Sequence, residues 1–393
     1  MNNLNSVCFK CCGCNLCSEV CPTKAIIMAE DEEGFNTYKI DESKCIHCGL
    51  CIKKCPQNNY KVENEYEQKF YCAHINKDEI LKKSTSGGIF YAICESIVNK
   101  YPNNYAICGA SFNEDLEVEH IIIDDIKDIN KLMGSKYVQS NVNGIYKKIK
   151  ELLDNNVIVV FSGTPCQVSG LNFYLGKKYE NLYTIDLICH GVPSPLLFKK
   201  YILSLENKYG ELASYSFRNK DKNSWELRCN FNTKNKKYYR TDSTDSYYYN
   251  FIKGTIYRES CYNCLYARKE RVGDLTLGDF WGAEIEHPNN VNSLGNSAII
   301  INSKKGEYIF NIIKDKISYE ESSYEKMSKM NHNLVSPSIR PDIRNNIYKD
   351  INNKEYDAIV KENFKFKKSF KGTIKAIIPS SIKRTIKSYL KKG

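Results

Sequence analysis

Two cysteine runs near the N-terminus constrain this chain more than any other feature. Each run is followed by a proline, and the runs comprise Cys11, Cys14, Cys17 and Cys21, then Cys45, Cys48, Cys51 and Cys55. Both have the spacing C-x2-C-x2-C-x3-C-P, and the second run starts 34 residues after the first. This spacing is typical of bacterial proteins that bind two 4Fe–4S clusters, in which the fourth cysteine of each run binds the other cluster.

The exchange of fourth ligands predicts two ligand sets. One set is Cys11, Cys14, Cys17 and Cys55, and the other is Cys45, Cys48, Cys51 and Cys21. A structural zinc site is the alternative, but zinc takes four ligands rather than eight in two matching runs. A segment this small buries little apolar surface, so the clusters would serve as its core. Cys8 and Cys12 lie outside the register that Pro22 sets, and we expect neither to bind iron.

Composition places the rest of the chain among globular proteins. Of the 393 residues, 42% are hydrophobic and 26% charged, and no apolar run approaches the roughly 20 residues of a membrane-spanning helix. The N-terminus lacks the apolar core of a secretory signal, so the 18 cysteines indicate metal binding and a cytoplasmic location rather than disulfides.

The net charge of +11 is concentrated at the C-terminus. Residues 365–393 hold ten Lys or Arg and no acidic residue, so the remainder is nearly neutral and nucleic-acid binding is not expected. Ile382, Ile386 and Leu390 fall four residues apart and predict a basic amphipathic helix. Such a helix suits peripheral contact with an anionic membrane, and a solvated or partner-docking tail is the alternative.

We expect an α+β protein in which a ferredoxin-like dicluster domain precedes an α/β domain. The predicted boundaries are residues 1–62 for the dicluster domain, 68–155 and 156–330 for the two parts of the α/β region, and 331–393 for a basic C-terminal extension. Apolar periodicity predicts strands over 70–75, 105–112, 118–123, 157–161, 182–188 and 298–301, and helices over 89–98, 145–153 and 306–317.

The cysteines beyond the head fall into two groups. Cys72, Cys94, Cys108 and Cys229 have apolar or strand-like neighbours and are expected to be small buried hydrophobic residues. Cys166 and Cys189 each follow an apolar strand, and Cys261 and Cys264 form a C-x2-C pair. Spacing alone leaves three alternatives open for this second group: a third cluster, a zinc site or reactive thiols.

Several loops, taken in order, resemble the coenzyme F420 hydrogenase/dehydrogenase beta-subunit family. They span residues 84–88 (STSGG), 134–140 (GSKYVQS), 161–167 (FSGTPCQ), 186–195 (DLICHGVPSP), 261–264 (CYNC) and 273–282 (GDLTLGDFWG). With the cysteine-rich head, the resemblance covers roughly residues 5–320. It implies that 68–155 and 156–330 form a flavin-binding region that holds FAD and a third 4Fe–4S cluster. The implied cluster ligands are Cys166, Cys189, Cys261 and Cys264.

The flavin prediction also has a chemical argument. A pyrophosphate needs backbone N–H groups, which Ser86, Gly87 and Gly88 would supply before a helix, and a cation, which Lys136 beside Ser135 would supply. Thr164 is expected to hydrogen-bond the isoalloxazine or ribityl group. A plain helix N-cap is the alternative for the Ser/Gly loop. The sequence contains no G-x-G-x-x-G, which disfavours a Rossmann NAD site.

The predicted function is that of an oxygen-sensitive iron–sulfur flavoprotein oxidoreductase of anaerobic metabolism. Electrons would pass from the clusters to a flavin and on to a small organic substrate or an acceptor like coenzyme F420. The alternative is a non-catalytic electron-transfer subunit, and in both cases we expect a redox partner such as a ferredoxin or a hydrogenase or dehydrogenase subunit. His190 either donates a proton during reduction or hydrogen-bonds a cluster, and Asp274 and Asp279 are expected to set turns.

Overall fold

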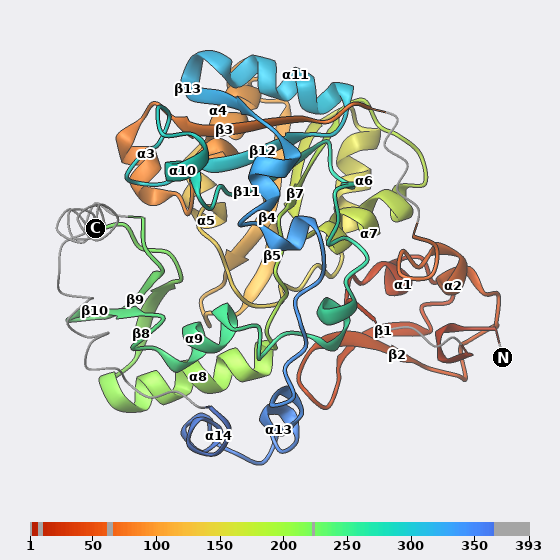
Figure 1. Cartoon of the computed structure of the whole chain (residues 1–393). Coiled ribbons are helices and arrows are strands. Elements are labelled where there is room, and N and C mark those ends of the chain that lie inside the picture. The colour runs from red at the N-terminus through yellow and green to blue at the C-terminus, as the bar shows by residue number, and fades with distance from the viewer. Residues whose placement is uncertain (1, 7–10, 61–65, 222–224, 365–393) are drawn as a thin grey trace.

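The computed structural model describes residues 2–6, 11–60, 66–221 and 225–364. A small N-terminal head lies against a larger α/β body, and residues 195–263 and 344–364 add a second layer beside that body (Figure 1). The predicted class, a small domain followed by a larger α/β domain, is confirmed. The amphipathic helix predicted around Ile382 lies outside the described residues, and its contact with a membrane stays a prediction.

The head is a hairpin with three short helical segments. Its elements are η1 (Leu4–Ser6), α1 (Leu16–Glu19), β1 (Ile26–Glu30), β2 (Asn36–Ile40) and α2 (Leu50–Lys54). β1 and β2 pair antiparallel on either side of an acidic turn. The buried cluster inside the head consists of Leu4, Ile26, Cys51 and Cys55, so cysteines replace much of an ordinary core.

An eight-stranded mixed sheet forms the centre of the body. Its order is β13-β3-β12-β11-β7-β6-β4-β5. The strands are β3 (Lys69–Ile75), β4 (Tyr105–Phe112), β5 (Val118–Ile123), β6 (Ile158–Gly163), β7 (Leu182–Leu187), β11 (Leu275–Asp279), β12 (Ser297–Ile301) and β13 (Ile317–Ser322). Because β4, β6, β7 and β11 are parallel, the loops that follow them meet at one edge of the sheet, where open α/β sheets place ligands.

Helices cover both faces of this sheet. α4 (Ile89–Lys100) and α11 (Lys304–Ile313) pack on one face, and α6 (Ile145–Asp154) and α7 (Pro165–Leu175) pack on the other (Figure 1). The predicted helix over 306–317 is shorter than expected, because β13 begins at Ile317. The shorter helices are α3 (Asp78–Lys83), η2 (Ile126–Asp128), α5 (Ile129–Leu132), α10 (Ala283–Glu286), η4 (Lys314–Lys316), α12 (Tyr324–Ser328) and η5 (His332–Leu334).

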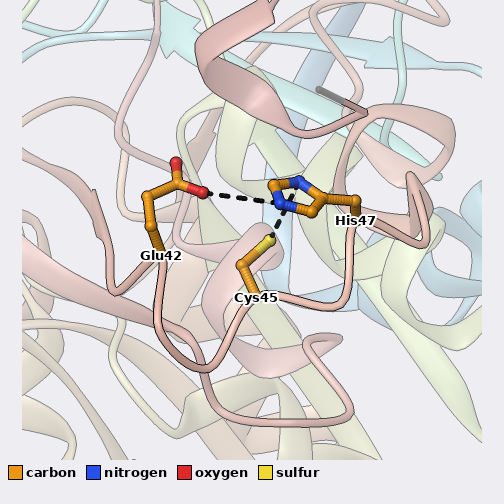
Figure 2. Close-up of side chains that lie close together, drawn as sticks. All are labelled: Glu42, Cys45 and His47. Atoms are coloured by element: carbon orange, nitrogen blue, oxygen red, sulfur yellow. Dashed lines mark hydrogen bonds and ion pairs between the residues drawn. The ribbon is translucent and has the colours of Figure 1, made fainter.

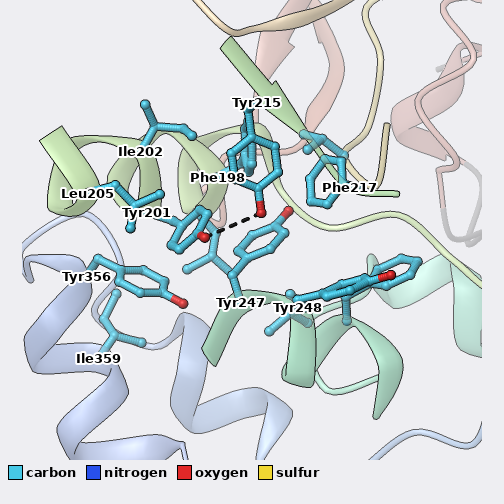
Figure 3. Packing of buried hydrophobic residues seen from close by; sticks show 14 of the residues in the cluster. Phe198, Tyr201, Ile202, Leu205, Tyr215, Phe217, Tyr247, Tyr248, Tyr356 and Ile359 are labelled. Carbon is cyan, nitrogen blue, oxygen red and sulfur yellow. Dashed lines mark hydrogen bonds between the residues drawn. The ribbon is translucent and has the colours of Figure 1, made fainter. Parts of the chain in front are cut away.

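The second layer has a core rich in tyrosine and phenylalanine. It comprises α8 (Pro195–Tyr209), β8 (Leu212–Ser216), β9 (Arg228–Thr233), β10 (Lys237–Thr241), α9 (Ser246–Ile252), η3 (Glu259–Asn263), α13 (Arg344–Tyr348) and α14 (Tyr356–Asn363). Figure 3 shows Phe198, Tyr201 and Tyr247 packed together, with the Tyr201 and Tyr247 rings stacked 5.0 Å apart. The predicted extension from 331 therefore begins with ordered helices that complete this core.

The four cysteines expected to be hydrophobic residues are fully buried. Cys72, Cys94, Cys108 and Cys229 are each 0% exposed and lie in four different hydrophobic clusters. Among the described residues, no helix combines the length and the apolar character that crossing a lipid bilayer requires.

Candidate functional site

The first predicted cluster set comes together in the head. The Cys17 thiol lies close to those of Cys11 and Cys55, and Cys14 lies close to Cys11 and Cys17. Burial, together with these neighbours, raises the pKa of the Cys17 thiol well above its usual value. A group of crowded, buried thiols fits a cofactor whose iron ions bind thiolates and so remove the protons. The backbone N–H of Gly13 donates to the Cys11 sulfur (3.3 Å).

The second predicted set lies on the outer side of the head. Cys51 lies close to Cys48, and the Cys45 sulfur lies 3.8 Å from Nδ1 of His47 (Figure 2). Glu42 lies 3.9 Å from the other ring nitrogen of His47, so these three side chains have a geometry that could also hold a single metal ion. Because Cys45 opens the second cysteine run, it remains a predicted cluster ligand, and His47 and Glu42 are its exposed neighbours.

Polar side chains of the body hold the head in place. Arg258 donates to the carbonyl oxygens of Cys11 (2.7 Å) and Asn36 (2.8 Å), and the Asn36 N–H donates to Gln139 (2.8 Å). A Cβ on Gly13 would lie 2.3 Å from Nε2 of Gln139, so the tight approach of this loop requires glycine, whose φ is +69°. The cysteine run of the first set therefore faces the body.

The predicted third set converges from three separate loops. Cys166 lies in the first turn of α7, Cys189 follows β7, and Cys261 and Cys264 lie in and just after η3. The Cys189 thiol lies close to those of the other three. Burial, with these neighbours, raises the pKa of Cys189 well above its usual value. All four cysteines line one cavity, so the donor set fits a cubane cluster.

A buried network fixes the start of α7, which carries Cys166. His120 contacts the Ser140 hydroxyl (3.0 Å) and the Ser162 carbonyl (3.1 Å), and Gln167 donates to Ser140 (2.8 Å). Burial lowers the pKa of His120 to about 4, so the ring is neutral near pH 7. The sequence interpretation missed this network, because its members lie far apart along the chain.

The predicted flavin residues surround the same cavity, which has a volume of about 330 Å³. The cavity wall includes Ser86, Gly88, Ser135, Lys136, Thr164 and His190, together with the first residues of α4. Ser135 donates from its N–H to the Thr85 hydroxyl (2.7 Å), which joins the Lys136 loop to the loop before α4. Burial lowers the pKa of Lys136 to about 7, and a nearby diphosphate would restore its charge.

Most of the predicted flavin contacts are already engaged within the protein. The Lys136 ammonium donates to the carbonyl oxygens of Lys131 and Met133, at 2.9 Å each. Gly87 is absent from the cavity wall, and its N–H donates to the Ser297 hydroxyl (2.9 Å). The Ser86 hydroxyl donates to the Asn296 carbonyl (2.7 Å), and Thr164 caps α7 through Gln167. The backbone donors available at this wall are instead the N–H groups of the first turn of α4. The first N–H groups of a helix have no carbonyl acceptor within the helix.

The side chains of Asp274 and Asp279, both expected to set turns, bind distant residues instead. Asp274 accepts hydrogen bonds from the Thr184 N–H and hydroxyl on β7. Asp279 pairs with buried Arg218 at 2.7 Å and lines the cavity beside Trp281. Its second oxygen and Oδ1 of Asn331, which also lines the cavity, are buried without a hydrogen-bond partner. Unpartnered acceptors on a cavity wall suit a ligand that carries N–H or O–H donors, and the imide N–H of a flavin is one such donor. We conclude that the residues fit a flavin.

Asp186 connects the two loops that carry Cys189 and Cys264. Its carboxylate accepts hydrogen bonds from the backbone N–H groups of Val272 (3.1 Å) and Gly273 (3.2 Å) and pairs with Arg271 at 3.3 Å. Arg271 in turn donates to the carbonyl oxygens of Leu187 (2.8 Å) and Tyr266 (2.7 Å). This fully buried pair holds the two ligand loops at a set distance from each other.

Two family models match this chain. Residues 157–327 match the model for the C terminus of the coenzyme F420 hydrogenase/dehydrogenase beta subunit, and residues 10–59 match the 4Fe-4S dicluster domain. The region 157–327 belongs to the coenzyme F420 hydrogenase/dehydrogenase beta-subunit family. The head is a 4Fe-4S dicluster domain, which confirms the predicted iron–sulfur head and the resemblance drawn from the loop motifs.

The chain is also similar to a curated relative and to a chain of known structure. A subunit of the F(420)H(2) dehydrogenase of Methanosarcina mazei is 28% identical over 189 residues, which cover 46% of this chain and 53% of that protein. The chain therefore spans about half the length of the curated relative it matches. A chain of the F420-reducing [NiFe] hydrogenase complex from Methanosarcina barkeri is 17% identical, with a TM-score of 0.46; the match covers 77% of this chain and 95% of that one.

Proposed function

We propose that this protein is an iron–sulfur flavoprotein oxidoreductase of the family to which its central region belongs. Electrons would enter at the dicluster head and pass to a third cluster held by Cys166, Cys189, Cys261 and Cys264. They would then reach FAD in the adjoining cavity and an organic substrate or an F420-like acceptor. The supporting observation is that these four cysteines and all the predicted flavin residues except Gly87 line one cavity, whose wall also includes Cys12 and Gly13 of the head.

Each part of the cavity wall has a role in this proposal. The first-turn N–H groups of α4 and the Lys136 ammonium would hold the diphosphate of FAD. Asp279 and Asn331 would accept from ring or substrate N–H groups, and His190 faces the cavity beside Cys189. When bound, the clusters would exchange single electrons and the flavin would convert them to electron pairs. The protein orients these groups and keeps water from them.

Anaerobic purification with iron, acid-labile sulfide and flavin measured together tests this proposal. We expect about twelve irons per chain, because three 4Fe–4S clusters hold four each, and one flavin. A preparation that contains zinc and no isoalloxazine absorbance would contradict the proposal.

A non-catalytic electron-transfer subunit is the second candidate. It is favoured by the name of the curated relative, which is itself a subunit of a dehydrogenase. In that case the chain would carry electrons between partner subunits and would not turn over a substrate alone. Turnover of coenzyme F420 with a viologen dye by the isolated, cofactor-loaded chain separates the two candidates. An oxidoreductase should show turnover alone, whereas an electron-transfer subunit should show none without its partner subunit.

Replacing Cys261 with alanine is expected to remove the third cluster. The iron content should fall by about four per chain, while the flavin and the two head clusters remain, because Cys261 belongs to neither cysteine run of the head. Cys94→Ala is the matched control, since Cys94 is fully buried among apolar side chains and should leave the iron content unchanged. An unchanged iron content in Cys261→Ala would remove Cys261 from the ligand set.

A further inference from the structure

One C-terminal segment, residues 338–352, contacts both elements that carry the later ligands of the predicted third cluster. The Ser338 hydroxyl donates to the carbonyl oxygen of His190 (2.7 Å), in the loop that follows β7. Two residues later, Arg340 pairs with Glu259 at 2.9 Å, on η3. The predicted ligands on or directly after these two elements are Cys189, Cys261 and Cys264. The segment therefore holds the β7 loop and η3 from the same side.

The same segment binds the head at the turn between β1 and β2. Arg344 on α13 donates two hydrogen bonds of 2.5 Å to the two carboxylate oxygens of Glu33, and Asn352 donates to the Glu32 carbonyl oxygen (2.8 Å). Arg344 also donates to the Tyr257 carbonyl oxygen (3.0 Å), and its side chain is only 2% exposed. A bidentate pair between arginine and a carboxylate fixes the geometry of both partners. Figure 1 shows this segment in blue, running from the body down to α13.

The turn of the head fits closely against the second layer. A Cβ on Gly34 would lie 2.1 Å from the Cβ of Leu196 on α8, so this position requires glycine. Phe35 is 0% exposed, and its ring lies 5.5 Å from the ring of Tyr348 on α13. The apolar contacts of the turn and its ion pair with Arg344 thus involve the same helix, α13.

The first cysteine run lies where the position of the head has the largest effect. Cys12 and Gly13 line the cavity whose wall also includes Cys166. A Cβ on Gly170, one turn after Cys166 in α7, would lie 3.2 Å from the Cβ of Cys14. A predicted ligand of the first cluster thus lies beside the helix that carries a predicted ligand of the third. Because electron transfer between two centres depends steeply on their separation, a small movement of the head would change its rate.

We propose that residues 338–352 form a clamp that sets the position of the head relative to the third cluster, with Arg344 as its central positioning residue. This inference rests on the third cluster of the proposed function. The match to the beta-subunit family model ends at residue 327, so the clamp lies outside that match. A shift of the head against the clamp would break the pair of Arg344 with Glu33. The clamp takes no part in the chemistry: one electron leaves the first cluster and enters the third, and no covalent bond changes.

The first test is hydrogen exchange in the turn of the head, measured by mass spectrometry on the full-length, anaerobically purified protein. Arg344→Met should speed exchange over residues 31–36 by about tenfold to a hundredfold, as expected for the loss of one hydrogen bond to a charged group. Arg344→Lys should restore part of the protection, because an ammonium can still pair with Glu33. Arg228→Met is the matched control. Its side chain is 5% exposed and pairs with Glu226 at 2.7 Å within the second layer, so exchange over residues 31–36 should not change.

The second test measures whether the clamp serves electron transfer. In the fully reduced native protein, electron paramagnetic resonance should show a magnetic splitting between the first and third clusters. Arg344→Met should lose this splitting and slow the reduction of the flavin that follows reduction of the head, while the iron and flavin contents stay native. Glu33→Gln keeps the shape of the side chain and should give a smaller effect in the same direction. Combined with Arg344→Met it should add little, because both changes remove the same pair.

The outcomes separate the clamp from the proposed function. Native exchange over residues 31–36 in both Arg344→Met and Glu33→Gln would overturn the clamp, and Glu33→Gln alone decides if Arg344→Met does not fold. Faster exchange with unchanged splitting and unchanged flavin reduction would overturn its role in electron transfer. A native protein with about eight irons would instead show that the third cluster of the proposed function is absent. The exchange test would then still decide whether this segment holds the head.

Discussion

Replacing Asp186 with alanine is expected to destabilise the protein by about 3–5 kcal/mol, the usual cost of removing one partner from a buried ion pair. Asp186 is 0% exposed and pairs with the Arg271 side chain, which is 1% exposed. The change removes the carboxylate that holds Arg271, Val272 and Gly273 at the end of β7. Because Arg271 also binds the backbone near Cys264, the third cluster should be lost as well.

The free energy of unfolding from anaerobic urea titration, together with the iron content, checks this prediction. Glu151→Ala is the control, because Glu151 makes an exposed ion pair with Lys147 at 3.9 Å along α6. Removing such a pair should change the stability by less than about 1 kcal/mol. A loss below about 1 kcal/mol in Asp186→Ala would show that the pair is not needed to hold the two ligand loops.

Replacing Lys136 with methionine is expected to weaken FAD binding by about tenfold to a hundredfold. That range corresponds to the loss of one hydrogen bond to a charged group, about 1.5–3 kcal/mol. Met keeps most of the length of the side chain and removes the ammonium group that would face the diphosphate. The dissociation constant of FAD, measured by flavin fluorescence with the cofactor-depleted protein, checks the effect.

The pH dependence of binding gives a second readout. The pKa of Lys136 in the flavin-free protein is lowered to about 7, so the ammonium loses its proton as the pH rises above 7. A bound diphosphate would raise this pKa, so binding takes up a proton and the native affinity should fall between about pH 7 and pH 9. Lys136→Met should show no such fall.

The matched control for Lys136 is another lysine to methionine change. Lys147→Met alters an exposed lysine on α6 whose side chain is 72% exposed, and FAD affinity should not change. Equal affinity of the native protein and Lys136→Met across this pH range would place the diphosphate elsewhere in the cavity.

Local patterns predicted most of the body. The strands over 105–112 and 118–123 begin and end at the predicted residues, because each is an apolar segment bounded by polar turns. The helix expected over 306–317 was too long, since the pairing of Ile317 with Ile75 makes β13 begin there. An apolar residue at this boundary suits either a helix or a strand, and only its partner across the sheet decides.

Sequence patterns were weaker guides to individual side chains at the site. Gly87 was predicted to bind a phosphate, yet its N–H donates to Ser297 on β12. Asp279 was expected to set a turn, yet it pairs with Arg218 from a distant loop. In each case the partner is far away in sequence, and no local spacing indicates it.

The sequence by itself determined the iron–sulfur chemistry of the head, because the spacing of thiols over a few residues decides whether a 4Fe–4S cluster can bind. The dicluster head and the strand-loop order of the family follow from such short-range patterns. The tertiary structure alone decided which loops meet. Parallel pairing of β6 and β7 brings Cys166 and Cys189 to one sheet edge, and η3 brings Cys261 and Cys264 to the wall of the same cavity. Docking of the head then places Cys12 on the wall of the same cavity, since long-range contacts arise from packing that local spacing does not encode.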